Sequence, residues 1–164
     1  MARALIVGCG CRGRQLGRAL LDEGWAVRGT SRREEGLEAI AAAGLEAAIA
    51  DPDRPGTILD LVGDVAVVVL LLGSARGTAE ELAAIHGPRL ERLLEHLVDT
   101  PVRGVLYEAV GSAGPQLLEA GAEQVRAAAR TWRIPVGILA PTAAAAWPGE
   151  AAQAALELLS RPGG

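Results

Sequence analysis

A glycine-rich turn near the start of the chain is the feature that most constrains its fold. Three glycines form a G-x-G-x-x-G pattern: Gly8, Gly10 and Gly13. The pattern follows the apolar residues 4–7 and precedes a segment with Leu16 and Leu20 at helical spacing. A strand, a tight glycine turn and a helix in this order are typical of the opening unit of a parallel α/β sheet. The sequence therefore predicts such a sheet.

Each glycine of the pattern has its own expected role. Gly8 permits the tight turn, Gly10 lets the backbone approach a pyrophosphate, and Gly13 lets helix and strand pack closely. The amino terminus of the following helix adds unpaired N–H groups and a partial positive charge. These features predict a dinucleotide site, to which Cys11 and Arg12 also contribute. The alternative interpretation is a strand-to-helix turn that binds nothing.

The rest of the chain alternates strand-like and helical segments. The expected strands are residues 4–7, 26–30, 47–50, 65–72, 104–109 and 136–139. This alternation predicts an α/β protein, in which helices cover both faces of a doubly wound, six-stranded parallel sheet. Residues 65–72 are apolar throughout, so this segment is expected to be a central strand buried on both faces.

Composition excludes several classes of function. All 16 basic residues are arginines, so lysine-dependent chemistry such as a Schiff base is excluded. Aromatic residues are only 2% of the chain and its net charge is −4, so nucleic acid is an unexpected partner. No apolar run is long enough to span a membrane and no secretory signal precedes the first strand, so we expect a cytoplasmic protein. The arginine-rich, lysine-free composition indicates a GC-rich bacterial genome.

Cysteine and histidine are too few for a metal site. The two cysteines, Cys9 and Cys11, lack a further cysteine or a nearby histidine to complete a ligand set. We expect both to be small residues that fill a crowded turn. His86 and His96 lie ten residues apart on one predicted helix, outside the spacing of a ligand pair.

The segment after the second expected strand selects the nucleotide. An NAD site usually has an acidic residue about twenty positions past the glycine pattern. Here the chain has Thr30, Ser31 and Arg32, which can hydrogen-bond and neutralise a 2′-phosphate. NADP is therefore predicted over NAD, with Arg12 as a second cation on that phosphate or stacked on the adenine. The alternative is that Arg32 and Arg33 only decorate a helix start.

In these residues the chain resembles the extended and atypical short-chain dehydrogenase/reductases. This superfamily of NAD(P)-binding Rossmann proteins includes the nucleotide-sugar epimerases. The resemblance implies that Asp51 contacts the adenine and that Leu71, Leu72 and Gly73 line the adenosine ribose. Residues 86–94 are similar to the family's long fourth helix, and residues 134–141 to its sixth strand and the proline after it. Extended members of the family add a C-terminal substrate domain, whereas this sequence has one helix after the sixth expected strand, so we expect residues 1–164 to be a single Rossmann domain without a separate substrate domain.

The catalytic residues of the resembled family are missing. Its hydride-transferring members carry a Tyr-x-x-x-Lys dyad at the start of the fifth helix, where this chain has Pro115 and Glu119. The tyrosine is the general acid and base, and the lysine lowers its pKa. Weaker candidates for the substrate side are Ser112, Glu108 and Thr142, together with Tyr107, which is more simply interpreted as a packed aromatic residue.

The sequence leaves three functions open. The chain is a reductase or epimerase-like enzyme with non-standard proton transfer, an NADP-binding protein that reports redox state without turnover, or a scaffold with a vestigial cofactor site. A small-molecule substrate accompanies only the first. The helices with Leu90–Val98 and Leu118–Trp132 occupy the positions of the family's dimer interface, so the resemblance also implies a homodimer.

Overall fold

The central sheet has the strand order β3-β2-β1-β4-β5-β6. The computed structural model describes residues 2–140 and 145–160, and within these ranges all six strands are parallel. The strands are β1 (Arg3–Val7), β2 (Ala26–Ser31), β3 (Glu46–Ile49), β4 (Val67–Leu70), β5 (Gly104–Glu108) and β6 (Val136–Leu139). The predicted doubly wound parallel sheet is confirmed.

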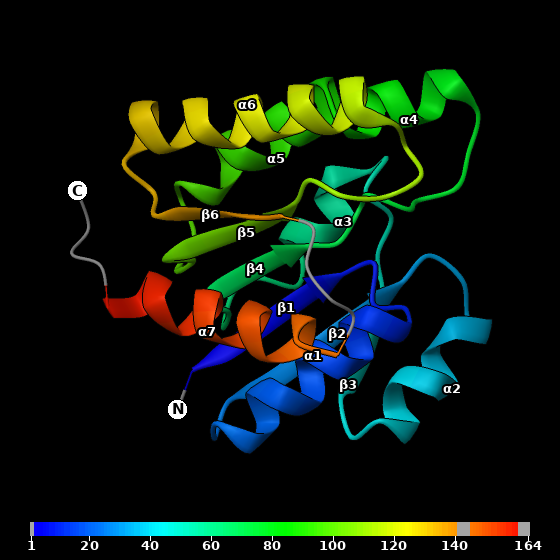
Figure 1. Ribbon diagram of the computed structural model, residues 1–164, viewed down its shortest axis with the longest axis vertical. Coiled ribbons are helices and arrows are strands. Elements are labelled where there is room, and N and C mark those ends of the chain that lie inside the picture. Colours follow the sequence, from blue (N-terminus) through cyan, green and yellow to red (C-terminus); the bar gives the residue numbers. More distant parts are fainter. Residues whose placement is uncertain (1, 141–144, 161–164) are drawn as a thin grey trace.

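Helices cover both faces of this sheet (Figure 1). One face carries α1 (Cys11–Asp22), α2 (Glu35–Ala42) and α7 (Trp147–Ser160). The other carries α3 (Pro55–Leu59), α4 (Ala79–Ile85), α5 (Pro88–Leu97) and α6 (Pro115–Trp132). None of the helices in the described ranges is long and apolar enough to cross a membrane.

Strand β4 is the centre of the apolar core. All four of its side chains are buried, because they alternate between the two helical layers. The regular strand is shorter than the apolar run 65–72, although Leu71 continues the pairing by donating its N–H to the Val7 carbonyl oxygen at 3.0 Å. The central position expected for this run is confirmed.

The expected long fourth helix is interrupted. His86 ends α4, Gly87 takes a non-helical conformation with φ −121° and ψ −106°, and Pro88 begins α5. Proline is favoured at the first turn of a helix, where its missing N–H costs nothing. The prediction that His86 and His96 share one helix is therefore wrong: His86 is buried after α4, whereas His96 is exposed on α5.

The strand order reverses between β1 and β4. Strand β1 is followed by α1 on one face, and β4 leads to α4 and α5 on the other. Parallel sheets of this kind leave a crevice at the carboxyl ends of the strands where the direction of winding changes. The glycine-rich turn lies at this crevice, directly after β1.

Candidate functional site

The glycine turn combines two glycines that the fold requires with one that it does not. Gly8 has φ 80°, and a Cβ atom there would lie 2.5 Å from the Leu71 carbonyl oxygen. A Cβ atom at Gly13 would lie 3.2 Å from both Cys9 Sγ and a methyl carbon of Ile6. At Gly10 it would meet no protein atom within 4 Å. Packing therefore explains Gly8 and Gly13, whereas Gly10 keeps a surface open.

The amino terminus of α1 faces that open surface. The residue before the helix is Gly10, so no side chain caps the first N–H groups, and the first turn has no acidic residue. Unpaired N–H groups and the helix dipole give such a terminus a partial positive charge. The turn therefore has the geometry and the electrostatics of an anion site.

A hollow of about 470 Å³ extends from the glycine turn toward β2 and β3. Its wall includes Thr30 and Ser31 at the end of β2 and Arg32 directly after it, and Ala50 and Pro52 after β3. Leu71 and Leu72 after β4 close the central side. Three cationic side chains border it, and none of its described lining residues is acidic: the arginines are Arg14, Arg32 and Arg76.

Thr30, Ser31 and Arg32, at the carboxyl end of β2, make different contacts in this wall. Thr30 is buried, and its hydroxyl oxygen accepts a long hydrogen bond from the Gly8 N–H at 3.4 Å. The Ser31 hydroxyl donates to the Arg33 carbonyl oxygen at 2.8 Å. Arg32 is exposed and donates from Nη2 to the Arg76 carbonyl oxygen, also at 2.8 Å. Arg32 therefore reaches from the end of β2 to the loop after β4.

Two residues that the resemblance places at the cofactor lie beside the wall rather than in it. Asp51 accepts a hydrogen bond at Oδ1 from the Asp53 N–H at 2.9 Å, while its neighbours line the hollow. Gly73 lies where the ends of β4 and β5 approach each other, against the Val110 carbonyl group. Ser74, the next residue, lines the hollow instead.

A second hollow, of about 250 Å³, lies on the other side of the glycine turn. It shares Gly8, Gly10, Leu71 and Ser74 with the first, and it ends at Glu108 on β5. Cys11, Arg12 and Gly13 complete its wall. The two hollows therefore form one continuous groove along the carboxyl ends of β2, β1, β4 and β5. We refer to the two hollows together as the groove.

An ion pair between a half-exposed arginine and a buried carboxylate closes the β5 end of the groove. The Glu108 side chain is only 4% exposed, and its Oε2 atom lies 2.5 Å from Arg12 Nη1. The Arg12 guanidinium stacks on Trp147, with Cζ 4.2 Å from the ring centroid. Burial raises the pKa of Glu108 above its ordinary value, against the opposing effects of the Arg12 cation and a hydrogen bond from the Gly73 backbone.

This ion pair corrects the expectation for Arg12. The sequence predicts Arg12 as a second cation on the 2′-phosphate or as a stacking partner of the adenine. In the structure its guanidinium points toward β5 and stacks on Trp147, while Arg14, two positions further along α1, borders the hollow next to β2. Successive helical residues point in directions about 100° apart, so these two arginines face opposite ends of the groove.

Tyr107 lies on the opposite face of β5 and borders neither hollow. It is fully buried, and its hydroxyl lies 2.6 Å from Nδ1 of His86. The other ring nitrogen of His86 is 3.1 Å from the Leu72 carbonyl oxygen, which can only accept, so Nε2 carries the proton and Tyr107 donates. Burial raises the pKa of Tyr107 and lowers that of His86. Both side chains are neutral packing groups that support the end of β4.

The remaining polar candidates contribute less to the groove. Ser112 is exposed in the loop after β5 and borders neither hollow, and Thr142 lies outside the described residues. At the positions that the resemblance assigns to the dyad, Pro115 begins α6 and Glu119 is exposed. Glu119 accepts a hydrogen bond from Arg126 at 3.0 Å. Glu108 is the candidate that the structure brings to the groove.

The two cysteines differ in their surroundings. Cys9 is buried, its sulfur packs beside Gly13 and Gly29, and burial raises the pKa of its thiol to about 11. The expectation that it fills a crowded turn is confirmed. Cys11 is exposed at the start of α1 and borders the smaller hollow, so the same expectation is wrong for Cys11.

Sequence reasoning missed several residues at the groove, among them Arg14, Ser74 and Arg76, which line it, and Trp147, on which Arg12 stacks. The loop after β4 carried a usable signal, because the carboxyl ends of parallel strands meet at one edge of a sheet. Arg76 follows β4 by six residues, so it was a candidate to face the arginines after β2. For Trp147 the chain carried no such signal.

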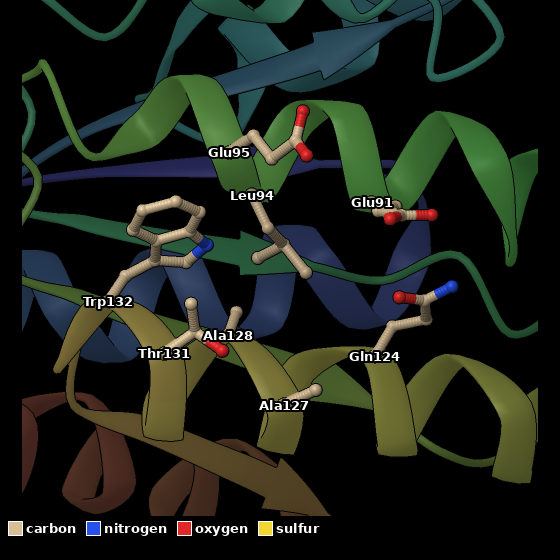
Figure 2. A pocket seen from close by; sticks show the side chains of 8 residues that line it. All are labelled: Glu91, Leu94, Glu95, Gln124, Ala127, Ala128, Thr131 and Trp132. Carbon is tan, nitrogen blue, oxygen red and sulfur yellow. The ribbon is translucent and has the colours of Figure 1, made fainter.

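A third hollow, of about 200 Å³, lies between α5 and α6 on the face of the sheet away from α1 and α7 (Figure 2). Figure 2 shows Glu91, Leu94 and Glu95 of α5 opposite residues of α6 that include Gln124 and Trp132. Trp132 is 43% exposed, which is unusual for so large an apolar side chain.

Comparison with solved structures shows a shared fold. A UDP-glucuronic acid 4-epimerase from Bacillus cereus, in complex with NAD and a fluorinated UDP-sugar, is 14% identical with a TM-score of 0.66 and matches 83% of this chain and 55% of its own. A short-chain dehydrogenase/reductase superfamily protein from Agrobacterium tumefaciens, with bound NAD, is 20% identical with a TM-score of 0.68, and the match covers 83% of this chain and 48% of that protein. UDP-glucose 4-epimerase from Thermotoga maritima, with UDP-glucose, is 11% identical with a TM-score of 0.67, and the match covers 83% of this chain and 54% of that protein.

The similarity of this chain to known proteins lies in its three-dimensional structure and not in its sequence. No protein-family profile matches the sequence, and no curated protein matches it. This chain spans about half the length of the three solved proteins. With its strand order and its glycine turn, the chain has the Rossmann fold found in short-chain dehydrogenases/reductases and nucleotide-sugar epimerases.

Proposed function

We propose that this protein binds NADP(H) in the groove, in preference to NAD(H). The charge of the larger hollow carries the proposal, because Arg14, Arg32 and Arg76 border it without any acidic residue among its described lining. A carboxylate would accept hydrogen bonds from ribose hydroxyls but repel a 2′-phosphate, whereas guanidinium groups bind phosphate oxygens directly. Bound NAD in two of the solved structures supports a nicotinamide dinucleotide in general.

The glycine turn fits the pyrophosphate of such a ligand. The open surface at Gly10 allows close approach, and the uncapped amino terminus of α1 offers N–H groups to the anion. In this orientation the adenosine half occupies the larger hollow. The nicotinamide half then occupies the smaller hollow, next to Glu108 and Cys11.

The nicotinamide supplies hydride chemistry when it is bound. Without a Tyr-x-x-x-Lys dyad, the chain either reduces a substrate by a different proton transfer or binds the dinucleotide and reports its redox state. The buried carboxyl group of Glu108 at the nicotinamide end favours the first use, since a proton-transferring group is what that chemistry requires.

Titration calorimetry with NADP, NADPH, NAD and NADH tests this function. We expect NADP(H) to bind more tightly than NAD(H), and a strong preference for one redox form would favour redox sensing. Binding by none of the four would contradict the proposal and leave the scaffold interpretation.

The variant Arg32→Ala tests the assignment of the phosphate. It is expected to weaken NADP binding by about 1.5–3 kcal/mol, the contribution of a hydrogen bond to a charged group, and to leave NAD nearly unchanged. Arg33→Ala is the matched control, because it removes the same charge from a neighbouring exposed residue outside the wall. Equal losses for NADP and NAD in Arg32→Ala would rule out its contact with the 2′-phosphate.

We also propose that α5 and α6 form a homodimer interface. The exposed Trp132 and the hollow beside it support this proposal, which otherwise rests on the resemblance stated above.

A further inference from the structure

We propose that Glu108 is the proton-holding group of the groove, and that a phosphate bound at the glycine turn makes Glu108 take up a proton by drawing Arg12 away. The inference rests on the proposed function, because the phosphate it invokes is the pyrophosphate of the dinucleotide. According to this inference, Glu108 carries a transferable proton only when a phosphate-containing ligand occupies the groove.

The first support is the arrangement of buried polar atoms that lack a hydrogen-bond partner. In the described part of the chain, two buried side-chain atoms lack a hydrogen-bond partner: Glu108 Oε2 and Trp147 Nε1. Both belong to residues that contact Arg12, one through an ion pair without hydrogen-bond geometry and one through ring stacking. Buried polar atoms are nearly always hydrogen-bonded, so this concentration around one arginine indicates a place that a ligand or a proton completes.

The second support is the position of Arg12. It is the second residue of α1, at the helix terminus that forms the anion site, and 42% of its side chain is exposed. A guanidinium group binds phosphate oxygens as well as it binds a carboxylate, so a pyrophosphate competes with Glu108 for it. Glu108 cannot follow, because it belongs to β5 and is 4% exposed.

Loss of Arg12 leaves Glu108 with a charge that its surroundings do not support. A buried carboxylate without a countercharge is strongly unfavourable, and protonation is the usual response. Burial already raises the pKa of Glu108, and Arg12 is the cation that opposes this effect. Removal of Arg12 therefore shifts the carboxyl group further toward its neutral form.

The other neighbours of Glu108 do not replace the lost charge. Cys11 of α1 borders the same hollow, and Trp147 of α7 does not titrate. Tyr107, the preceding residue of β5, stays neutral because burial raises its pKa. The loop after β4 contributes the backbone of Gly73. Among the described residues, Arg12 is the cation in ion-pair contact with Glu108.

The held proton has a use in carbonyl chemistry. A bound reduced nicotinamide would supply a hydride to an aldehyde or ketone, which would form the new C–H bond as the electron pair of the C=O bond moves to oxygen. Glu108 donates its carboxyl proton to that oxygen, which gives the alcohol and leaves the carboxylate. Arg12 then pairs with the carboxylate again once the phosphate leaves. This step would supply the proton transfer that the missing dyad performs elsewhere.

Calorimetry in buffers of different ionisation enthalpy tests the switch, because the dependence of the observed heat on the buffer gives the number of protons taken up. The probes are NADP and inorganic pyrophosphate, at several values between about pH 5 and pH 8, above the ordinary glutamate pKa. We expect each to bind with an uptake of up to one proton. In Glu108→Gln, binding persists and the uptake disappears.

Two further variants make the result specific. Glu119→Gln is the matched control, because it removes an exposed carboxylate that borders neither hollow, and its uptake should equal that of the wild type. In Arg12→Met, Glu108 lacks its cation before any ligand arrives, so the uptake on binding should again disappear. An infrared difference spectrum should show a protonated carboxyl band on NADP binding that is absent in Glu108→Gln.

The outcomes separate this inference from the proposed function. NADP binding without proton uptake, or with equal uptake in Glu108→Gln, would overturn the switch alone. Uptake driven by pyrophosphate without NADP binding would overturn the proposed function alone, and binding of neither probe would overturn both.

The donor role is tested by NADPH oxidation with small aldehydes and ketones. We expect the rate to fall about 100-fold or more in Glu108→Gln, with NADPH binding retained. Equal rates in both proteins, or no turnover in the wild type, would overturn the donor role.

Discussion

At the scale of single residues, the groove is determined by side chains whose neighbours are distant in the sequence. Arg12 and Glu108 are separated by 96 positions (108 − 12), and Arg32 and Arg76 by 44 (76 − 32). Sequence reasoning names Arg12, Glu108 and Arg32 as candidates, but it pairs Arg12 with a cofactor phosphate rather than with Glu108 and does not name Arg76. Local pattern therefore predicts most of these residues but neither interaction.

Glu108→Gln is expected to raise the melting temperature at neutral pH. The folded state raises the pKa of Glu108 through burial, so it holds this proton at pH values where the unfolded chain has already released it. By linkage, the contribution of Glu108 to stability is largest below the ordinary glutamate pKa and is lost as the pH rises through the higher folded pKa. The advantage of Gln should therefore vanish in acid and grow with pH.

Melting temperatures of wild type and Glu108→Gln across this pH range measure the effect. The exposed Glu119→Gln should show no comparable divergence. A wild type that gains stability relative to Glu108→Gln as the pH rises would mean that Arg12 outweighs burial at Glu108.

Gly10→Ala is expected to separate binding from folding. A Cβ atom at Gly10 meets no protein atom within 4 Å, so the melting temperature should change little. The same atom projects into the groove, where it should weaken NADP binding by about tenfold or ~1.4 kcal/mol. Gly8→Ala should instead destabilise the protein, because of its positive φ and the Leu71 carbonyl oxygen. Unchanged NADP binding in Gly10→Ala would place the pyrophosphate elsewhere.

At the scale of elements, the contact between α6 and β5 depends on one glycine. Gly121 of α6 lies directly against the Tyr107 ring and hydroxyl, so the helix approaches the strand where it has no side chain. Tyr107 also bonds to His86 after α4. Three elements of this face therefore meet at the Tyr107 hydroxyl.

Gly121→Ala is expected to lower the free energy of unfolding by roughly 1–3 kcal/mol, because a Cβ atom there overlaps Tyr107. Gly149→Ala in α7 is the matched control: its Cβ atom meets nothing within 4 Å, so the change should be neutral or stabilising by up to about 1 kcal/mol. Denaturant unfolding measures the free energy of unfolding of both variants.

A double variant identifies the contact responsible. If Gly121→Ala lowers the free energy of unfolding less in a Tyr107→Phe background, the destabilisation comes from the contact with the Tyr107 hydroxyl. Equal effects of Gly121→Ala and Gly149→Ala would contradict this prediction.

The elements themselves could largely be predicted from the sequence. Strand β6 has the predicted bounds, since Pro135 precedes it and Pro141 follows it. The apolar run at β4 likewise identifies a central strand. The break between α4 and α5 is harder to predict, because the apolar spacing continues across His86 while Gly87 and Pro88 decide the boundary. The site could be predicted in part: most of its residues could be named from the sequence, but their contacts across the groove arise from tertiary structure.

At the scale of the whole molecule, the two faces of the sheet have different tasks. The face with α1 and α7 holds the Arg12–Glu108 ion pair at the β5 end of the groove. The face with α5 and α6 carries Trp132 and the hollow of Figure 2. Binding and association can therefore be altered separately.

Trp132→Arg is expected to convert a dimer into a monomer, because it replaces an exposed apolar side chain of the proposed α5–α6 interface with a charge. Sedimentation velocity over a range of protein concentrations measures the change. Ile49→Arg is the control, since Ile49 is an equally exposed apolar residue on β3, at the opposite edge of the sheet. A wild type that sediments as a monomer at every concentration would contradict the interface.

The stacking of Arg12 on Trp147 gives the protein an optical reporter of its own. Indole emission responds to its immediate surroundings, and of the three tryptophans only Trp147 contacts the cation at the groove. Trp25 packs in the core beside β2, and Trp132 lies on the far face between α5 and α6. The proposed movement of Arg12 can therefore be followed by fluorescence in the unlabelled chain, on the timescale of ligand arrival.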